Sequence, residues 1–234
     1  MTTTPARAGL DQGLLEALAS RALSHVRDGA LVGLGSGRTA SAFVRALGAR
    51  VHRGLHVRGV PTSEATARLA REVGVPLAGL DEGVLDLTVD GADEVDPRLD
   101  LIKGYGGALV RERIVAAASR RLVIVAGAEK LVPTLGTRGR LPVEVTPFAC
   151  PLATRELAAL GCRPALRTVD GRPFVTDNGN WIIDCGVRPI EAPADFARDL
   201  RAIPGVVDTG LFVGMADLVL VADSAGIREM RRVR

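Results

Sequence analysis

The stretch from residue 85 to residue 112 reads LDLTVDGADEVDPRLDLIKGYGGALVRE, and it joins a buried strand to a helix through a polar, glycine-rich segment. The apolar, β-branched residues 85–89 predict a short buried strand that ends at Asp90 and Gly91. The apolar spacing after Ala108 predicts a helix. Groups that directly follow such a strand lie at the rim of an α/β sheet, where ligands bind. The stretch therefore predicts a site at this edge.

Three carboxylates and one ammonium surround the glycine-rich turn of this stretch. Asp90 and Asp93 follow the strand, Lys103 precedes the helix, and Glu112 lies on an early turn of the helix. Carboxylates and a fixed ammonium are the groups that proton-transfer chemistry needs. Turn formation and helix capping are the structural alternative for the two aspartates.

Lysine is scarce in this chain. Of 30 Lys and Arg residues only Lys103 and Lys130 are lysine. Because an ammonium and a guanidinium differ in hydration, geometry and titration, we interpret both positions as ones that require lysine. A codon bias that left two lysines by chance is the alternative explanation.

Composition excludes several classes of protein. With 234 residues and 47% hydrophobic content, the chain can form one large domain or two unequal ones. The net charge is only +3, aromatic residues make up 3%, and no basic stripe is interleaved with aromatics, so we expect no nucleic-acid partner. The N-terminus lacks an apolar signal core, and no apolar run approaches the ~20 residues of a membrane span, so we expect no membrane partner.

The cysteines and histidines indicate neither disulfides nor a metal site. Cys150, Cys162 and Cys185 are odd in number, lie apart, and have no histidine at metal-ligand spacing. We therefore expect a reduced, cytoplasmic protein without a metal.

A second glycine-rich segment follows the predicted strand at residues 30–34. Residues 35–39 read Gly-Ser-Gly-Arg-Thr and lead into a predicted helix that runs to about Leu47. Free backbone N–H groups and the helix dipole would make this turn an anion site, with help from the Ser36 and Thr39 hydroxyls. Tight strand-to-helix packing is the alternative reason for the glycines. In the dinucleotide-binding fingerprint G-x-G-x-x-G, Arg38 stands at the position of the third glycine, which argues against a dinucleotide as ligand. A small phosphate ester is then the expected ligand.

Strands and helices alternate up to about Gly136, which predicts an α/β fold with a Rossmann-like, doubly wound, mostly parallel sheet. Beyond it, short strands, two helices and a hairpin turn at residues 177–180 predict a smaller inserted α+β domain. We place the first domain at residues 1–135 plus 209–234 and the second at residues 136–208. The arginines at positions 228, 231, 232 and 234 are expected to cap a last helix.

With these motifs in view, the chain resembles type A ribose-5-phosphate isomerase over nearly its full length. Several blocks carry the resemblance in order along the chain: residues 32–40 (VGLGSGRTA), 90–94 (DGADE), 101–109 (LIKGYGGAL) with Arg111 and Glu112, 142–145 (PVEV), 176–180 (TDNGN) and 203–207 (IPGVV).

The resemblance implies an aldose-ketose isomerase that interconverts D-ribose 5-phosphate and D-ribulose 5-phosphate in the pentose phosphate pathway. It implies a Rossmann-like domain with a ferredoxin-like lid, no metal or nucleotide cofactor, and a homodimer or homotetramer. It also implies Glu112 as the catalytic base. The substrate-binding positions that it implies are Ser36, Gly37, Arg38 and Thr39, then Asp90, Gly91, Ala92 and Asp93, then Lys103, Gly104, Tyr105 and Gly106, and finally Lys130.

The chain departs from the family's pattern at a few of these positions. The family usually has threonine and serine where Ser36 and Arg38 stand, and a small or apolar residue in place of Tyr105. Arg38 either contacts phosphate or points to solvent. Before Lys130 the family usually has Asp-x-Ser/Thr, whereas this chain has Gly127-Ala128-Glu129, a change that could loosen Lys130.

These residues suggest a mechanism. Glu112 would move a proton between C1 and C2 through an enediolate, and Lys103 with the turn amides would stabilise the oxygen charge. Asp90 and Asp93 should not both ionise easily, so we expect one of them to have a raised pKa and to shuttle protons. The rival interpretations are a non-catalytic sugar-phosphate sensor on the same fold and a transferase of coenzyme-A type.

Overall fold

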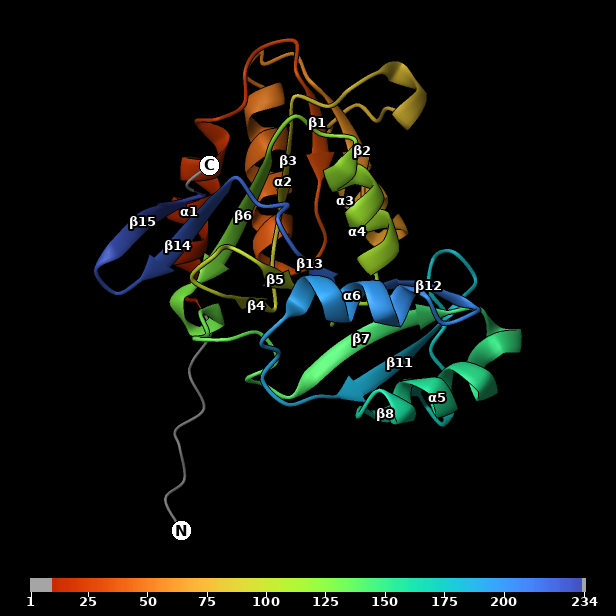
Figure 1. Cartoon of the computed structure of the whole chain (residues 1–234). Coiled ribbons are helices and arrows are strands. Elements are labelled where there is room, and N and C mark those ends of the chain that lie inside the picture. The colour runs from red at the N-terminus through yellow and green to blue at the C-terminus, as the bar shows by residue number, and fades with distance from the viewer. Residues whose placement is uncertain (1–9, 233–234) are drawn as a thin grey trace.

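A computed structural model of the chain describes residues 10–232. Residues 1–9 of the expected first domain and Arg234 of the C-terminal arginine run lie outside the described residues. The centre of the molecule is a six-stranded sheet in the order β15-β14-β6-β3-β1-β2 (Figure 1). Its strands are β1 (Leu31–Leu34), β2 (Arg58–Pro61), β3 (Leu87–Asp90), β6 (Leu122–Gly127), β14 (Leu218–Asp223) and β15 (Gly226–Arg231).

Five of these strands are parallel to their neighbours, and only β15 runs antiparallel, to β14. Helices cover both faces, so every residue of β1, β3 and β6 is buried. This is why those strands are continuous apolar runs rather than alternating ones. The predicted doubly wound α/β fold is confirmed.

Three helices pack on one face of the six-stranded sheet and one on the other. The first group shares a core with the even-numbered positions of β1 and the odd-numbered positions of β3 and β6. It consists of α1 (Gln12–Leu23), α2 (Arg38–Val51) and α3 (Glu64–Glu72). The opposite face is covered by α4 (Leu109–Ala117) and by a small three-stranded sheet. The Ser63 side chain caps α3 by accepting a hydrogen bond from Thr66 N.

The three-stranded sheet turns the chain back on itself beside the end of β3. It has the order β13-β5-β4 and consists of β4 (Glu94–Val95), β5 (Leu101–Ile102) and β13 (Leu211–Phe212). Between β4 and β5 the Asp96 carboxylate accepts hydrogen bonds from the N–H groups of Arg98 and Asp100, which holds a tight turn. Lys103 is thereby returned to the neighbourhood of Asp90.

A four-stranded antiparallel sheet forms the lower part of the molecule in Figure 1, in the order β12-β7-β11-β8. Its strands are β7 (Arg140–Val145), β8 (Arg163–Leu166), β11 (Trp181–Gly186) and β12 (Val206–Thr209), and its helices are α5 (Cys150–Ala159) and α6 (Pro193–Arg201). The chain order β-α-β-β-α-β is that of a ferredoxin-like unit. Shorter elements are β9 (Thr168–Val169), β10 (Arg172–Pro173), η1 (Leu80–Glu82), η2 (Ala128–Lys130) and η3 (Pro147–Ala149).

Two predictions of secondary structure are wrong. The C-terminal arginines do not cap a helix, because Gly226, with φ +121°, allows a tight turn and residues 226–231 pair with β14 as an edge strand. The sequence also predicts that one of the short strands beyond Gly136 spans residues 173–176, but only Arg172 and Pro173 pair, with β9, and Val175 makes a single bridge to Trp181. Within residues 10–232 no helix is both long and apolar enough to cross a membrane.

Candidate active site

The site lies where the carboxyl ends of β1 and β3 meet. These strands are parallel neighbours, with Leu34 opposite Val89, and the chain leaves them towards opposite sides of the sheet. Ligands of doubly wound sheets bind at such a switch point. A Cβ atom at Gly35 would overlap the Cα and the carboxylate of Asp90. Only glycine therefore lets the two loops approach this closely.

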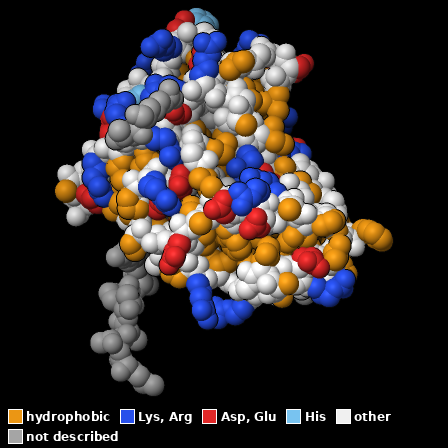
Figure 2. Space-filling model, viewed as in Figure 1, with side chains coloured by type: hydrophobic (Ala, Val, Ile, Leu, Met, Phe, Trp, Pro, Cys, Tyr) orange, Lys and Arg blue, Asp and Glu red, His pale blue; other side chains and the backbone are white. Residues whose placement is uncertain are grey.

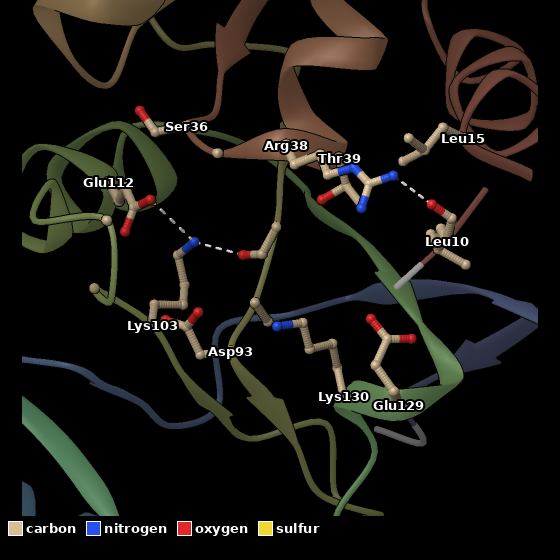
Figure 3. A pocket seen from close by; sticks show the side chains of 15 residues that line it. Leu10, Leu15, Ser36, Arg38, Thr39, Asp93, Lys103, Glu112, Glu129 and Lys130 are labelled. Carbon is tan, nitrogen blue, oxygen red and sulfur yellow. Dashed lines mark hydrogen bonds and ion pairs between the residues drawn. The ribbon is translucent and has the colours of Figure 1, made fainter. Parts of the chain in front are cut away.

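Lys103 occupies the centre of the site and is 3% exposed. Its Nζ lies 2.5 Å from the carbonyl oxygen of Gly91 and 3.4 Å from Glu112 Oε1 (Figure 3). It also lies 3.0 Å from Asp90 Oδ2. Burial alone would lower the pKa of this ammonium, but Asp90 and Glu112 outweigh burial and raise the pKa. Lys103 is thus a fixed positive charge between two carboxylates.

Glu112 lies on the first turn of α4 and is 5% exposed. Its Oε1 faces Lys103, whereas its Oε2 has no hydrogen-bond partner among the described residues. Burial, with smaller contributions from Asp90 and Asp93, raises the pKa of Glu112 to about 8, although Lys103 acts in the opposite direction. A carboxylate in this state is a stronger base than an exposed one.

The two aspartates occupy different environments. Asp90 is buried, and its Oδ1 accepts bonds from the N–H groups of Ser36 and Gly91 while its Oδ2 faces Lys103. Asp93 Oδ2 accepts a 2.9 Å bond from Tyr105 N. The pKa of Asp93 is raised mainly by burial, and its charged neighbours are cations that lower it. One aspartate does have a raised pKa, but burial causes it rather than the expected repulsion between Asp90 and Asp93.

The opposite wall of the pocket is the N-terminus of α2. Gly37, with φ +92°, precedes the helix and offers no side chain to cap its first N–H groups, and Thr39 lines the pocket. The Ser36 hydroxyl turns to a buried hydroxyl cluster that it forms with Thr62, Ser63 and Thr66. The uncapped helix end can bind an anion through its N–H groups.

Two cations frame this wall. The guanidinium of Arg38 donates a hydrogen bond to the carbonyl of Leu10, and its exposed side chain lines the pocket. Lys130 lines the pocket from η2, and its ammonium has no hydrogen bond or ion pair within the described part of the chain. Figure 3 shows the Lys130 side chain extending into the space between Asp93 and Arg38.

At residues 127–129, where this chain departs from the family's pattern, Glu129 still supplies a carboxylate. A Cβ atom at Gly127 would overlap the carboxylate of Glu129, which therefore occupies the space beside the Gly127 backbone. The η2 turn is closed by a 3.1 Å bond from Leu131 N to the carbonyl of Ala128. Lys130 is therefore held in a hydrogen-bonded turn. This argues against the suggestion from the sequence that the change before Lys130 loosens it.

Most residues predicted from the sequence surround one cavity of about 270 Å³. Those that line it are Ser36, Gly37, Arg38, Thr39, Gly91, Ala92, Asp93, Lys103, Gly104, Gly106, Glu112 and Lys130. Asp90 lies behind Lys103, and the Tyr105 side chain turns away to donate a bond to the carbonyl of Arg140.

Three lining residues were not predicted to line the site: Leu10, Leu15 and Glu129. Leu15 belongs to the apolar spacing of α1 and Leu10 lies just before this helix, and an apolar residue there does not distinguish a pocket wall from the core. Within residues 10–232 no group of three or more His, Cys, Asp and Glu side chains is placed to hold a metal ion.

Comparison with known proteins agrees with this geometry. A protein-family model described as Ribose 5-phosphate isomerase A (phosphoriboisomerase A) matches residues 58–226. Ribose-5-phosphate isomerase A of Roseiflexus sp. (strain RS-1) is 53% identical over 216 residues, which cover 91% of this chain and 93% of the relative. The protein of that name from Gloeobacter violaceus is 52% identical, with 92% and 94% covered.

Solved structures have the same fold. A D-ribose-5-phosphate isomerase in complex with phospho-erythronic acid has a TM-score of 0.91 and 38% identity, and covers 94% of this chain and 99% of that one. Ribose 5-phosphate isomerase A of Methanocaldococcus jannaschii has the same TM-score and identity, with 95% and 100% covered. By sequence, fold and the geometry of its pocket, this chain belongs to the ribose-5-phosphate isomerase A family.

Proposed function

We propose that this protein interconverts D-ribose 5-phosphate and D-ribulose 5-phosphate, a step of the pentose phosphate pathway, with Glu112 as the base. The observation that carries this proposal is the pair of Glu112 and Lys103, 3.4 Å apart and nearly inaccessible to solvent, across the pocket from the uncapped end of α2. A proton acceptor, a fixed cation and an anion site are the parts that isomerisation of a sugar phosphate requires.

Glu112 would transfer the proton between two adjacent carbons. It removes the proton from C2 of the open-chain aldose, which gives an enediolate, and returns it to C1. Meanwhile the O2 proton passes to O1, so that the carbonyl moves from C1 to C2 and no atom is gained or lost. Glu112 Oε2 is free for this because no described group hydrogen-bonds to it. General-base catalysis of this kind contributes roughly 10²–10⁴-fold in rate.

Lys103 would stabilise the negative charge that develops on the sugar oxygens. Its ammonium is held by three oxygens of Asp90, Gly91 and Glu112, so it needs no reorganisation during the reaction. Asp93, whose pKa is raised by burial, is our candidate for the proton transfer between O2 and O1.

The phosphate would lie against the N-terminus of α2. The N–H groups of the helix, the Thr39 hydroxyl and the ammonium of Lys130, which has no partner within residues 10–232, supply the donors, and Arg38 at the rim adds a positive charge. Phospho-erythronic acid, the ligand named for a solved relative, has a phosphate and a carboxylate. A carboxylate holds two oxygens in one plane, as an enediolate does, which fits a site built for this intermediate.

The decisive experiment supplies ribose 5-phosphate to the purified protein in D₂O with EDTA and follows ribulose 5-phosphate by NMR. Transfer through an enediolate predicts deuterium at C1 of the ketose. Glu112→Gln should reduce kcat by roughly 10²–10⁴-fold with little change in KM. Glu156→Gln, an exposed glutamate on α5, is the matched control and should behave as wild type. Binding without turnover by the wild type would refute the proposal and favour the sugar-phosphate sensor.

We also propose that the chain assembles as a homodimer or homotetramer. Phe148 is 99% exposed in η3, and Val207 is 38% exposed on β12, which is an edge strand of the four-stranded sheet. In Figure 2 hydrophobic side chains gather over the lower part of the molecule, where this sheet and α6 lie. Exposed apolar groups at a sheet edge favour contact with another chain. Light scattering of the wild type and of Phe148→Asp tests this assembly.

A further inference from the structure

Arg167 reaches from the four-stranded sheet to the glycine turn of the active site. It lies between β8 and β9, and its side chain is 10% exposed. Its Nε and Nη2 donate to the Asp184 carboxylate at 2.9 and 2.6 Å. Its Nη1 donates to the carbonyl oxygens of Gly104 and Tyr105, at 3.2 and 3.1 Å. A single guanidinium thus joins β11 to two successive peptide units of the turn.

The hydrogen bonds from Arg167 determine the orientation of these two peptide units. In a planar trans peptide the C=O and N–H bonds point in opposite directions. The unit between Gly104 and Tyr105 offers its C=O to Arg167 and its N–H to Asp93 Oδ2, at 2.9 Å. The next unit offers the Tyr105 C=O to Arg167, so the Gly106 N–H points the opposite way.

The Gly106 N–H is available to a ligand. Gly106 lines the pocket, and its N–H has no hydrogen-bond acceptor within residues 10–232. Gly106 is exposed where it lines the pocket, so an oxygen of a bound ligand can reach this N–H. A free N–H at the wall of a polar pocket therefore fits a donor that is completed by an oxygen of the substrate.

We propose that Arg167 is a positioning residue for the isomerase reaction. It fixes the turn so that one N–H holds the Asp93 carboxylate and the next is presented to an oxygen of the reacting sugar. This inference rests on the proposed function. Gly104, with φ +99°, and Gly107, with φ +89°, leave Tyr105 as the side chain that restrains the turn from within, and Arg167 adds a restraint from a distant strand.

Arginine is needed because of its shape. A planar guanidinium presents five N–H donors in a fixed fork, and it can bind a carboxylate and two carbonyls at once. The ammonium of a lysine keeps the charge but cannot reproduce the bidentate contact with Asp184. Arg167→Lys therefore removes the geometry and keeps a positive charge beside Asp184 and the turn.

Arg140 provides a matched control. Its Nε pairs with the same carboxylate, 3.0 Å from Asp184 Oδ1, and its guanidinium lies 4.4 Å from the centre of the Tyr105 ring. Its side chain makes no hydrogen bond to the carbonyls of the turn. Arg140→Lys thus perturbs the same carboxylate and the same tyrosine without releasing the two peptide units.

The test compares steady-state isomerisation and ligand binding in the two lysine variants. Arg167→Lys should lower kcat by about tenfold or more while KM changes by less than about threefold, because misplaced donors act in the transition state. Inhibition by phospho-erythronic acid should weaken in proportion to kcat, and inhibition by inorganic phosphate should be unchanged. Arg140→Lys should match the wild type in all four measurements.

Wild-type kcat in Arg167→Lys, or an equal loss in both lysine variants, would overturn the inference. Asp184→Asn, which keeps the guanidinium but weakens its anchor, gives an independent test that should show a smaller loss in kcat. It also replaces the first test if Arg167→Lys does not fold by circular dichroism. If the wild type itself lacks isomerase activity, the proposed function fails, and binding of phospho-erythronic acid by the variants still decides whether Arg167 positions the turn.

Discussion

Glu112 combines two properties that conflict in an ordinary protein interior. It is a nearly inaccessible carboxyl group, and one of its oxygens has no partner among the described residues. Burying a carboxylate without full hydrogen bonding is costly, and the group reduces that cost by holding its proton more tightly. The nearby ammonium of Lys103 limits the effect. Together they give a carboxylate that ionises near neutral pH and is basic enough to remove a carbon-bound proton.

This state of Glu112 predicts the pH dependence of the reaction. A base works when it is ionised, and the pKa of Glu112 is raised to about 8. We therefore expect kcat/KM to rise with pH through the neutral range and to level off above about pH 8, instead of levelling off near the ordinary glutamate value of about 4.3. The measurement is kcat/KM from pH 5 to pH 9.5. An activity that is flat from pH 5 to pH 8 would contradict the assignment of Glu112 as the base.

Lys103→Arg should strongly reduce activity although it keeps the charge. The ammonium contacts Asp90, Gly91 and Glu112, and Lys103 is only 3% exposed, so a guanidinium is too large and too planar for this space. We expect kcat to fall by about 10²-fold or more, comparable to the loss of an oxyanion donor. Steady-state kinetics of the purified variant gives the answer. Arg45→Lys, a change of an exposed side chain on α2, is the control.

The residues of the site that could be predicted from the sequence are those with a local signal. Asp90 follows a strand, Lys103 precedes a glycine turn, and Glu112 lies on the first turn of the next helix. Arg167 has no such signal, because its contact with the turn depends on how β8 pairs with β11 and on where the whole four-stranded sheet lies. Leu15 likewise looks like any apolar residue of an amphipathic helix.

At the scale of elements, the parallel sheet was predictable because its strands are buried on both faces and alternate with helices. The edges were not. Burial does not alternate along β15, and its exposed arginines, Arg228 and Arg231, are three residues apart, as on one face of a helix. Charged side chains are common on edge strands because they prevent pairing with another sheet. Whether the arginines mark a helix or an edge depends on β14, with which they pair.

The turn between β1 and α2 can be tested by Gly35→Ala. The new methyl group would overlap the backbone and the carboxylate of Asp90, so the two loops must separate. We expect a loss of about 1–3 kcal/mol in the free energy of unfolding, typical of overpacking. Activity should fall at least tenfold because Asp90 holds Lys103. Urea unfolding and kinetics measure both effects.

Gly13→Ala is the control for Gly35→Ala. Gly13 lies in α1, and an added Cβ atom would meet only Asp11 Oδ1, at 3.5 Å. Alanine at an exposed helix position is favoured over glycine by up to about 1 kcal/mol. This variant should be as stable as the wild type or more so, and fully active. If Gly35→Ala behaved in the same way, close approach of the loops would not be a requirement of the site.

At the scale of the whole molecule, the site depends on contacts between the two large sheets. Lys103 N donates to the carbonyl of Gly210, whose own N–H donates to the carbonyl of Pro142 on β7. Arg113, next to the candidate base on α4, donates to the carbonyls of Thr209 and Leu211 and pairs with Asp208. The base and the cation are therefore both connected to the segment around β12. The four-stranded sheet contributes no residue to the pocket lining, yet it helps to position the catalytic groups.

A third contact runs through the loop at residues 176–180. Asp177 Oδ2 accepts a bond from Glu64 N at the start of α3, and Arg111 on α4 donates to Asn178 and pairs with Glu64. The loop is held from behind by Glu144, which is fully buried on β7. Oε1 of Glu144 accepts hydrogen bonds from the side chains of Thr176, Asn178 and Asn180, and its Oε2 has no partner within the described part of the chain.

Glu144→Ala should therefore loosen the connection between the sheets. Removing the acceptor leaves three side-chain donors without it, at about 1–3 kcal/mol for each donor that stays buried, so we expect a loss of about 3 kcal/mol in the free energy of unfolding. Activity should also fall, because Arg111 adjoins Glu112 and loses its partner in the loop. Glu144→Gln keeps one oxygen as acceptor and removes a buried charge, so it should lose much less. Urea midpoints of the two variants, measured beside kcat, separate these effects; equal midpoints for Glu144→Ala and wild type would show that Glu144 does not hold the loop.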